Sequence, residues 1–137
     1  MNNKDTEQLD LLAIFHYVIG GILAFFSCIP LIHVFVGLMV VSGKVFTEAD
    51  GPPPRDAFGW IFVIVGSVFI LFGWTIAICI IVAGRKLKHR TGRMYCMVIA
   101  GVECMFMPFG TVLGVFTLIA LNKDSIKAIY TKSETEA

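Results

Sequence analysis

Glu103 is the residue of this 137-residue chain with the most unusual chemical setting. It is the only charged residue in the apolar stretch Met94–Leu121. An ionised carboxylate is costly in hydrocarbon, so such a residue usually faces protein or a water-filled cavity and takes up a proton readily. Glu103 is therefore a candidate proton or cation site.

His33, in the apolar stretch Leu11–Gly43, is the candidate partner of Glu103. A histidine–carboxylate pair can move protons near neutral pH. A packing role for Glu103 stays open, because a hairpin at Pro108 would bring it beside Thr111 and the unpaired N–H groups of the next helix. The other histidine in this stretch, His16, is expected at the inner membrane interface.

Other signs of chemistry are weak. The four cysteines (Cys28, Cys79, Cys96 and Cys104) show no C-x-x-C spacing and are expected to be reduced packing residues. The methionines and cysteines between Met94 and Met107 raise the idea of a Cu(I) path, but they lack a repeated spacing. No catalytic or nucleotide-binding fingerprint occurs. We therefore expect no metal, no cofactor and no enzyme activity.

The composition is that of a membrane protein. Hydrophobic residues make up 57% of the chain and charged residues 15%, against about 25% charged in soluble domains. This excludes a soluble enzyme, a disordered regulator and a nucleic-acid module. The net charge of +1 gives no overall basic field. An all-α integral membrane fold is expected.

Three stretches without Lys or Arg are long enough to cross a bilayer: Leu11–Gly43, Ala57–Gly84 and Met94–Leu121. The acidic N-terminus lacks the features of a cleaved signal peptide, so the first stretch is read as a retained span. The proline-rich connector Lys44–Asp56 is expected outside. A second connector carries five basic residues and no acid, which places it in the cytoplasm and also suits lipid headgroups; they are Arg85, Lys86, Lys88, Arg90 and Arg93.

The basic C-terminal tail decides the number of spans. If the third stretch bends back at Pro108, the tail joins the basic connector on the inner side, as the positive-inside rule favours. The prediction is a single membrane domain, 1–137, with four spans at about 11–43, 57–84, 90–107 and 111–121. The two hairpin arms, from about Arg90 to Met107 and from Thr111 to about Tyr130, would measure roughly 27 to 30 Å. The alternative is three long spans with a kinked third.

Small residues are expected to pack these helices. Gly59, Gly66 and Gly73 recur every seven residues, and Gly110 and Gly114 form a G-x-x-x-G pair. Such residues allow close contact between membrane helices, here within one chain rather than in a dimer. Residues 122–132 are predicted to form an amphipathic helix with Ile126, Ile129 and Tyr130 on one face. It would serve as an interfacial anchor or, alternatively, dock a partner.

Three strings carry a family resemblance: SCIPLIH from Ser27, AGVECMFMPFGTVLGVFTLIAL from Ala100, and SIKAIY from Ser125. Together they resemble a family of small, uncharacterised bacterial multi-span membrane proteins that share the motif E-C-x-F-x-P-F-G-T-x-L-G-V-F-T. The resemblance extends from about Leu11 to Tyr130. It implies a bacterial inner-membrane location and brings no activity or ligand.

The expected function is therefore non-catalytic. The chain would be an accessory or scaffold subunit, or a self-assembling bundle, with both termini in the cytoplasm. Its partners would be the lipid bilayer and further copies of itself or a larger membrane complex, with no nucleic acid. The alternative is a small oligomeric ion channel or proton-coupled transporter that uses Glu103. A lipid-binding protein that uses the Arg85–Arg93 cluster is a third interpretation.

Overall fold

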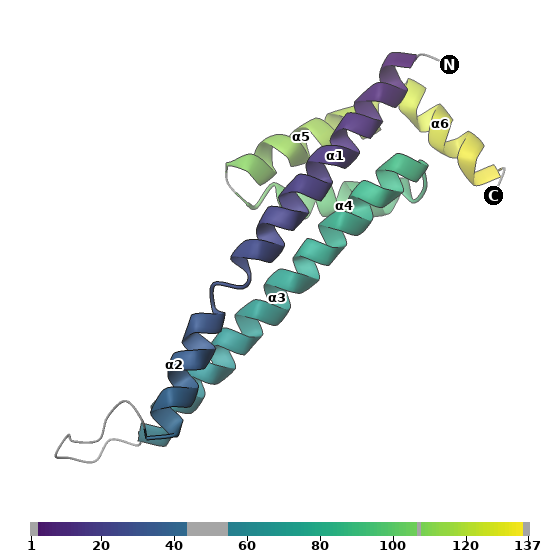
Figure 1. The fold of residues 1–137 in the computed structure, drawn as a ribbon. Helices are drawn as coiled ribbons and strands as arrows, with labels where there is room; N and C mark the ends of the chain where they lie inside the picture. The colour runs from purple at the N-terminus through teal and green to yellow at the C-terminus, as the bar shows by residue number, and fades with distance from the viewer. Residues whose placement is uncertain (1–2, 44–54, 107, 136–137) are drawn as a thin grey trace. The chain divides into compact units, whose positions relative to one another are not determined.

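The computed structural model describes residues 3–43, 55–106 and 108–135 (Figure 1). It contains six helices in these ranges and no strand, so the all-α prediction is confirmed. The helices are α1 (Asn3–Phe26), α2 (Leu31–Val41), α3 (Arg55–His89), α4 (Arg93–Glu103), α5 (Phe109–Asn122) and α6 (Asp124–Thr135).

Two helical stretches have the length and composition needed to cross a membrane. They are Asn3–Val41, with 39 residues, and Ala57–His89, with 33 residues. These stretches contain most of the first two predicted spans. The helix α5 is also apolar but has only 14 residues.

The first predicted span, residues 11–43, is not one helix. α1 ends at Phe26 and α2 starts at Leu31. Pro30 has no N–H to donate, which interrupts the helical ladder. The carbonyl oxygen of Phe26, four residues before Pro30, accepts instead from the Ile29 N–H at 3.0 Å. The outer connector, residues 44–54, lies outside the described residues.

The basic connector is mostly helical, which the sequence reading did not expect. α3 continues through Arg85, Lys86 and Lys88 to His89, and α4 starts at Arg93. Lys and Arg are good helix formers, and their charge is favourable at a helix C-terminus. Only residues 90–92 connect the two helices, and Gly92 has the positive φ of 63° that lets the chain reverse.

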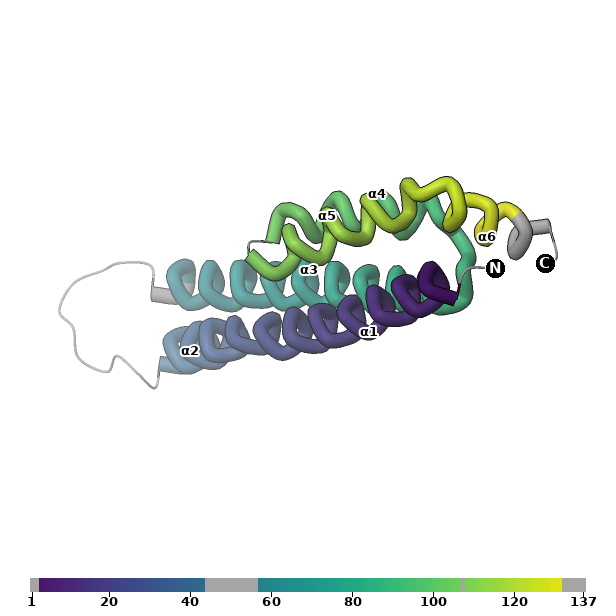
Figure 2. Tube along the Cα trace, turned by 90° about the horizontal axis from the view of Figure 1, so that it is seen from above, coloured from purple at the N-terminus to yellow at the C-terminus, as the bar shows by residue number. Residues whose placement is uncertain are grey.

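The third apolar stretch folds back at its proline, as the hairpin reading predicts. α4 and α5 lie side by side (Figure 2), and the chain between them turns over residues 104–108, of which Met107 is not described. The arms are shorter than predicted. α4 has 11 residues and α5 has 14, which correspond to about 16 and 21 Å. α4 already ends at Glu103. The backbone of Lys123 is extended, so α5 and α6 are separate helices.

The chain divides into two compact units. Unit 1 comprises residues 1–22 and 76–137, and unit 2 comprises residues 23–75. Part of α1 and part of α3 belong to each unit. Unit 1 has a buried apolar cluster formed by Leu9, Ala13, Leu87, Cys96, Ala120, Leu121, Ile126 and Tyr130.

The predicted amphipathic helix is present as α6. Ile126 and Tyr130 are buried in unit 1, and Ile129 is half-buried, so the apolar face of α6 packs on its own chain. Burial raises the pKa of the Tyr130 hydroxyl above its ordinary value, and the nearby charges of Arg90 and Arg93 offset part of this effect.

The predicted small residues lie at close helix contacts. In unit 2, the three predicted glycines of α3 lie against α2 and the residues just before it. Gly59 lies against Gly37 and Val41, and Gly66 lies against Pro30 and Val34. Gly73 lies against Ser27. In unit 1, Gly110 and Gly114 of α5 lie against the carbonyl oxygens of Glu103 and Ala100 in α4. These glycines therefore pack helices within the chain.

Replacing Gly114 by alanine should weaken the α4–α5 hairpin. The new Cβ would meet the Ala100 carbonyl oxygen and lie 3.1 Å from the Cys104 nitrogen, and a backbone cannot yield as a flexible side chain does. We expect a loss of about 1–3 kcal/mol in the free energy of unfolding, measured in mild detergent. Gly101→Ala is the matched control in α4, because its Cβ would meet nothing within 4 Å. Equal stability of the two variants would contradict the close packing.

Candidate functional site: a buried histidine–glutamate pair

Two ionisable side chains meet in the interior of unit 1. Nε2 of His16, on α1, lies 3.2 Å from Oε2 of Glu103, the last residue of α4. Both side chains are almost completely buried, with 0% and 1% of their surface exposed. The pair therefore connects α1 to the α4–α5 hairpin through two ionisable side chains.

The sequence of α1 explains why His16 is buried. Leu9, Ala13, His16 and Gly20 are all buried, and their spacing of three or four residues puts them on one face of the helix. Gly84 of α3 packs against this face, since a Cβ at Gly84 would lie 3.0 Å from the His16 Cβ. The absence of a side chain at Gly84 brings the two helices close together over the imidazole.

The hairpin turn holds the backbone of Glu103. Gly110 packs against its carbonyl oxygen, and the Phe106 nitrogen donates a hydrogen bond to the same oxygen at 2.9 Å. The Thr111 hydroxyl donates to the carbonyl oxygen of Cys104 at 2.8 Å. Thr111 thus secures the turn. The packing interpretation had expected Thr111 to be the partner of the Glu103 carboxylate, and the structure does not show this contact.

The hydrogen bonds of His16 define where its protons lie. Nδ1 is 2.8 Å from the carbonyl oxygen of Leu12, which only accepts, so Nδ1 carries a proton and donates it. Nε2 then faces Glu103 either without a proton or as part of an imidazolium ion. Without any proton between them, two lone pairs would face each other.

Two forms of the pair have no net charge: a neutral imidazole beside a carboxylic acid, and an imidazolium beside a carboxylate. A net charge in such a closed interior would be strongly unfavourable.

The polar groups of this interior are not fully satisfied. Within the described part of the chain, the second carboxyl oxygen of Glu103 and the buried hydroxyl of Thr117 have no hydrogen-bond partner. The His16–Glu103 approach itself is close but not aligned as a hydrogen bond. Each unsatisfied buried group costs about 1–3 kcal/mol. A functional role is one of the explanations for such groups in a native interior.

His33, the partner suggested for Glu103 by the sequence, is placed elsewhere. It belongs to unit 2, where its ring stacks on that of Phe62 with centroids 6.1 Å apart. The structure gives Glu103 a different histidine. His16, which was expected near the inner membrane interface, has a side chain that is fully buried within unit 1. The buried stripe of small and apolar residues around it was the signal that could have identified it.

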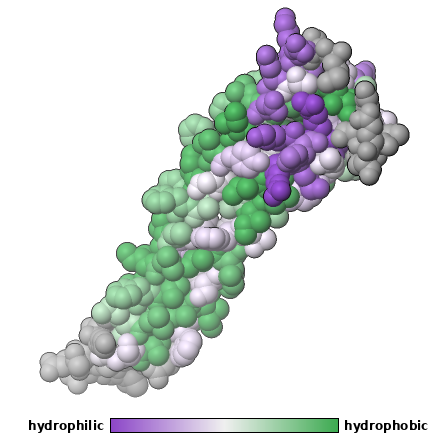
Figure 3. Space-filling view, turned by 45° about the vertical axis from the view of Figure 1, so that its right-hand side comes forward, coloured by the Kyte–Doolittle hydropathy of each residue, from purple (hydrophilic) through white to green (hydrophobic). Residues whose placement is uncertain are grey.

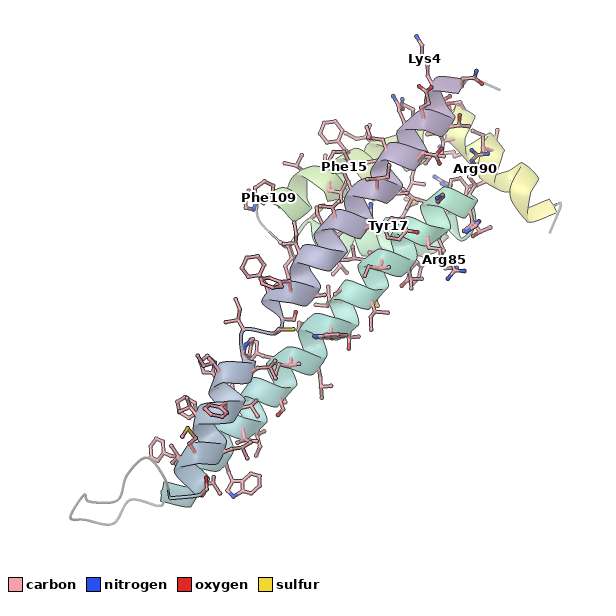
Figure 4. The ribbon with its side chains drawn as sticks, in the orientation of Figure 1. Lys4, Phe15, Tyr17, Arg85, Arg90 and Phe109 are labelled. Carbon is pink, nitrogen blue, oxygen red and sulfur yellow. The ribbon has the colours of Figure 1, made fainter. Side chains whose placement is uncertain are left out.

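Two residues of the predicted headgroup cluster have structural contacts. The Arg93 Nε donates to the Leu121 carbonyl oxygen at 3.0 Å, and the Lys86 ammonium lies 5.5 Å from the ring centre of Tyr95. Figure 4 labels Arg85 and Arg90, which lie near the end of α3. The role of the cluster in headgroup binding stays a prediction.

The cysteines form no ligand set with other residues. All four are free, and no three His, Cys, Asp or Glu residues come together among the described positions. The Cys96 thiol lies 3.7 Å from the Ala83 carbonyl oxygen, as a weak donor within the helix packing. The structure thus adds nothing to the Cu(I) interpretation.

Comparison with known proteins adds no relative. No family model matches the chain, and neither the curated proteins nor the solved structures contain a significant match. The resemblance to a bacterial membrane family stays a prediction, and the functional argument depends on the geometry of the chain itself.

A double-substitution cycle tests the coupling of His16 and Glu103. His16→Phe leaves a buried carboxyl group without its partner, and Glu103→Leu leaves an imidazole without its partner. Each should lower the free energy of unfolding in mild detergent by about 3–5 kcal/mol. The double variant should lose less than either single variant, because it leaves neither group behind. Additive losses would show that the two side chains do not interact.

Proposed function

We propose that this protein is a non-catalytic, multi-pass membrane protein of the bacterial inner membrane. It acts as an accessory or scaffold subunit, or assembles with copies of itself. The observation that carries this proposal is the contrast between an apolar exterior and a closed interior.

The exterior is covered by large apolar side chains. Phe25 of α1 is 74% exposed, Leu71 of α3 is 69% exposed and Phe109 of α5 is 78% exposed. Figure 3 shows the apolar surface, with hydrophilic residues gathered in one region, and Figure 4 shows Phe15 and Phe109 pointing outward. Apolar surface on this scale suits contact with lipid or with other membrane helices.

The interior is closed around its ionisable pair. His16 and Glu103 are inaccessible to solvent in this conformation, and Gly84 brings α3 against the histidine. A channel needs a continuous wet path, which an oligomer of this chain would have to provide.

Contacts in unit 1 support placing both ends of the chain on one side of the membrane. The Lys123 ammonium donates to the Gln8 side-chain oxygen at 2.9 Å, and α6 packs with Leu9 and Leu87 in the core of unit 1. The start of α1, the end of α3 and α6 therefore lie together. Since the basic cluster lies at the end of α3, the positive-inside rule favours the cytoplasm. The short hairpin then reaches only part of the way across the bilayer.

Native mass spectrometry in mild detergent tests the proposed role. An assembly subunit should appear as a defined oligomer of the 15.1 kDa chain or together with a larger membrane complex. A single chain at all concentrations, without any partner, would contradict the proposal.

A proton-coupled transporter or channel, built as an oligomer, is the second candidate. The buried His16–Glu103 pair favours it, because an ionisable pair inside a membrane segment is a suitable step on a proton path. Transport would require a second conformation in which water reaches Glu103.

Proton flux in proteoliposomes tests this second candidate. The native protein should carry protons down an imposed gradient, and Glu103→Gln should abolish this flux because an amide does not exchange a proton with His16. Asp10→Asn removes an exposed carboxylate from the same unit and should retain the flux. Equal flux through the native protein and Glu103→Gln would eliminate the candidate.

A further inference from the structure

Three cationic side chains lie at the start of α4 in unit 1. The Lys86 side chain passes over Gly92, the residue before α4, where an added Cβ would lie 3.1 Å from the ammonium nitrogen. Arg90 belongs to the short connector, and Arg93 is the first residue of α4. We call these three cations and the first turn of α4 the connector site. It is separate from the buried histidine–glutamate pair, and the function proposed above does not use it.

The first turn of α4 has free N–H groups. The first hydrogen bond of this helix runs from the Cys96 nitrogen to the Gly92 carbonyl oxygen at 3.2 Å, so the N–H groups of residues 93–95 have no partner in the described structure. Gly92 has no side chain that could cap them, and the first turn contains no acidic residue. The positive end of the helix dipole therefore has no negative group beside it to balance it.

The cations at this helix end also lack a counter-charge. Within the described part of the chain, the two ion pairs lie elsewhere, and Lys86, Arg90 and Arg93 take part in neither. A cation at a helix N-terminus is unfavourable, because it meets the positive end of the dipole. Cations and free N–H groups around one helix end together favour an anion as ligand.

A buried hydroxyl group without a partner lies in the same region. Tyr130 of α6 is 2% exposed, and neither its hydroxyl nor the buried Nε of Arg90 has a hydrogen-bond partner among the residues that the structure describes. The charges of Arg90 and Arg93 both act on this hydroxyl and oppose the rise of its pKa on burial. Arg90 is half-buried, so its flexible side chain connects the hydroxyl with the surface. An anion oxygen at this place would satisfy both donors.

The guanidinium group of Arg93 is already fixed. Its Nε donates to the carbonyl oxygen of Leu121, near the end of α5, at 3.0 Å. Its two terminal nitrogens have no partner in the described ranges and remain available as donors. A guanidinium group that is held in this way loses little further freedom when it binds a ligand, and its planar geometry suits phosphate oxygens.

The other two members of the predicted basic cluster, Arg85 and Lys88, lie outside the connector site. Both are exposed, and Figure 4 shows Arg85 pointing outward from α3. The predicted headgroup cluster therefore divides into three cations at the start of α4 and two on the exposed face of α3.

We propose that the connector site binds a phosphate group. Arg90, Arg93, the Tyr130 hydroxyl and the free N–H groups of α4 donate to the phosphate oxygens, and Lys86 adds positive charge. These donors are more than the two oxygens of a carboxylate would use, whereas a phosphate group presents several oxygens. The phosphate belongs to an anionic phospholipid headgroup or is a free phosphate ion. The site is formed by unit 1 alone, so only the lipid source depends on the membrane location proposed above.

Two titrations of the full chain in mild detergent test the proposal and identify the source of the phosphate. The first adds sodium phosphate at constant ionic strength and measures binding by calorimetry. The second adds phosphatidylglycerol or phosphatidylcholine with the same acyl chains and measures bound lipid by native mass spectrometry. At least tenfold tighter binding of phosphatidylglycerol identifies a lipid headgroup, and binding of the phosphate ion without this preference identifies free phosphate. Binding of neither phosphatidylglycerol nor the phosphate ion would overturn the proposal.

A matched pair of variants locates the phosphate. Arg90→Asn removes the guanidinium group, and asparagine tolerates the positive φ of 55° at this position. It should lower the affinity for the bound phosphate species at least tenfold, as expected for a hydrogen bond between charged groups. Arg85→Gln removes the same charge from the exposed face of α3 and should change the affinity by about twofold at most. Equal losses in both variants would indicate diffuse attraction to the basic surface and would refute the site.

Tyr130→Phe separates binding from folding. It removes only the hydroxyl, so the ligand-free protein should unfold at the same or a higher temperature, because an unsatisfied buried group is lost. The affinity for the phosphate species should still fall about tenfold. An unchanged affinity would place the phosphate elsewhere on the chain and overturn the proposal.

Extraction of native membranes with alkaline carbonate tests the membrane location independently. A protein that resists extraction but binds neither phosphate species would refute the connector site alone. A protein that is released by carbonate but binds the phosphate ion through Arg90 would refute the membrane location and leave the connector site standing.

Discussion

The close approach of His16 and Glu103 is the interaction around which the interior of unit 1 is arranged. An imidazole and a carboxyl group lie 3.2 Å apart there, with almost no exposure to solvent. The surrounding residues make this approach possible. Gly84 permits α3 to cover the histidine, and the bend at Pro108 ends α4 where its last side chain can meet α1.

The two units use the same packing principle for different purposes. In both, glycines bring helix backbones close together, as small residues do at the contacts between apolar helices. In unit 1 this closeness encloses an ionisable pair. In unit 2 a groove lies beside Gly66 and is lined in part by His33. The two histidines therefore differ in setting, since His16 is fully buried and His33 is exposed.

The sequence allowed the helical class, the fold-back at Pro108, the glycine contacts and the amphipathic helix α6 to be predicted, because each depends on local residue types or spacing. The break before Pro30 was not predicted, because residues 11–43 were assigned as one span from their apolar length and the N–H that proline lacks was not considered. The partner of Glu103 was also missed. Depth arguments selected His33, whereas the buried stripe Leu9, Ala13, His16 and Gly20 places His16 in the core.

The cluster that joins Leu9 to Tyr130 has a consequence for biosynthesis. These residues are separated by most of the chain, so the ribosome must make α6 before the first helix can gain its full set of neighbours. Until then, Leu9 and Leu87 lack the cover that Ile126 and Tyr130 provide. Products of premature termination would expose this apolar surface, which makes them substrates for chaperones and quality-control proteases.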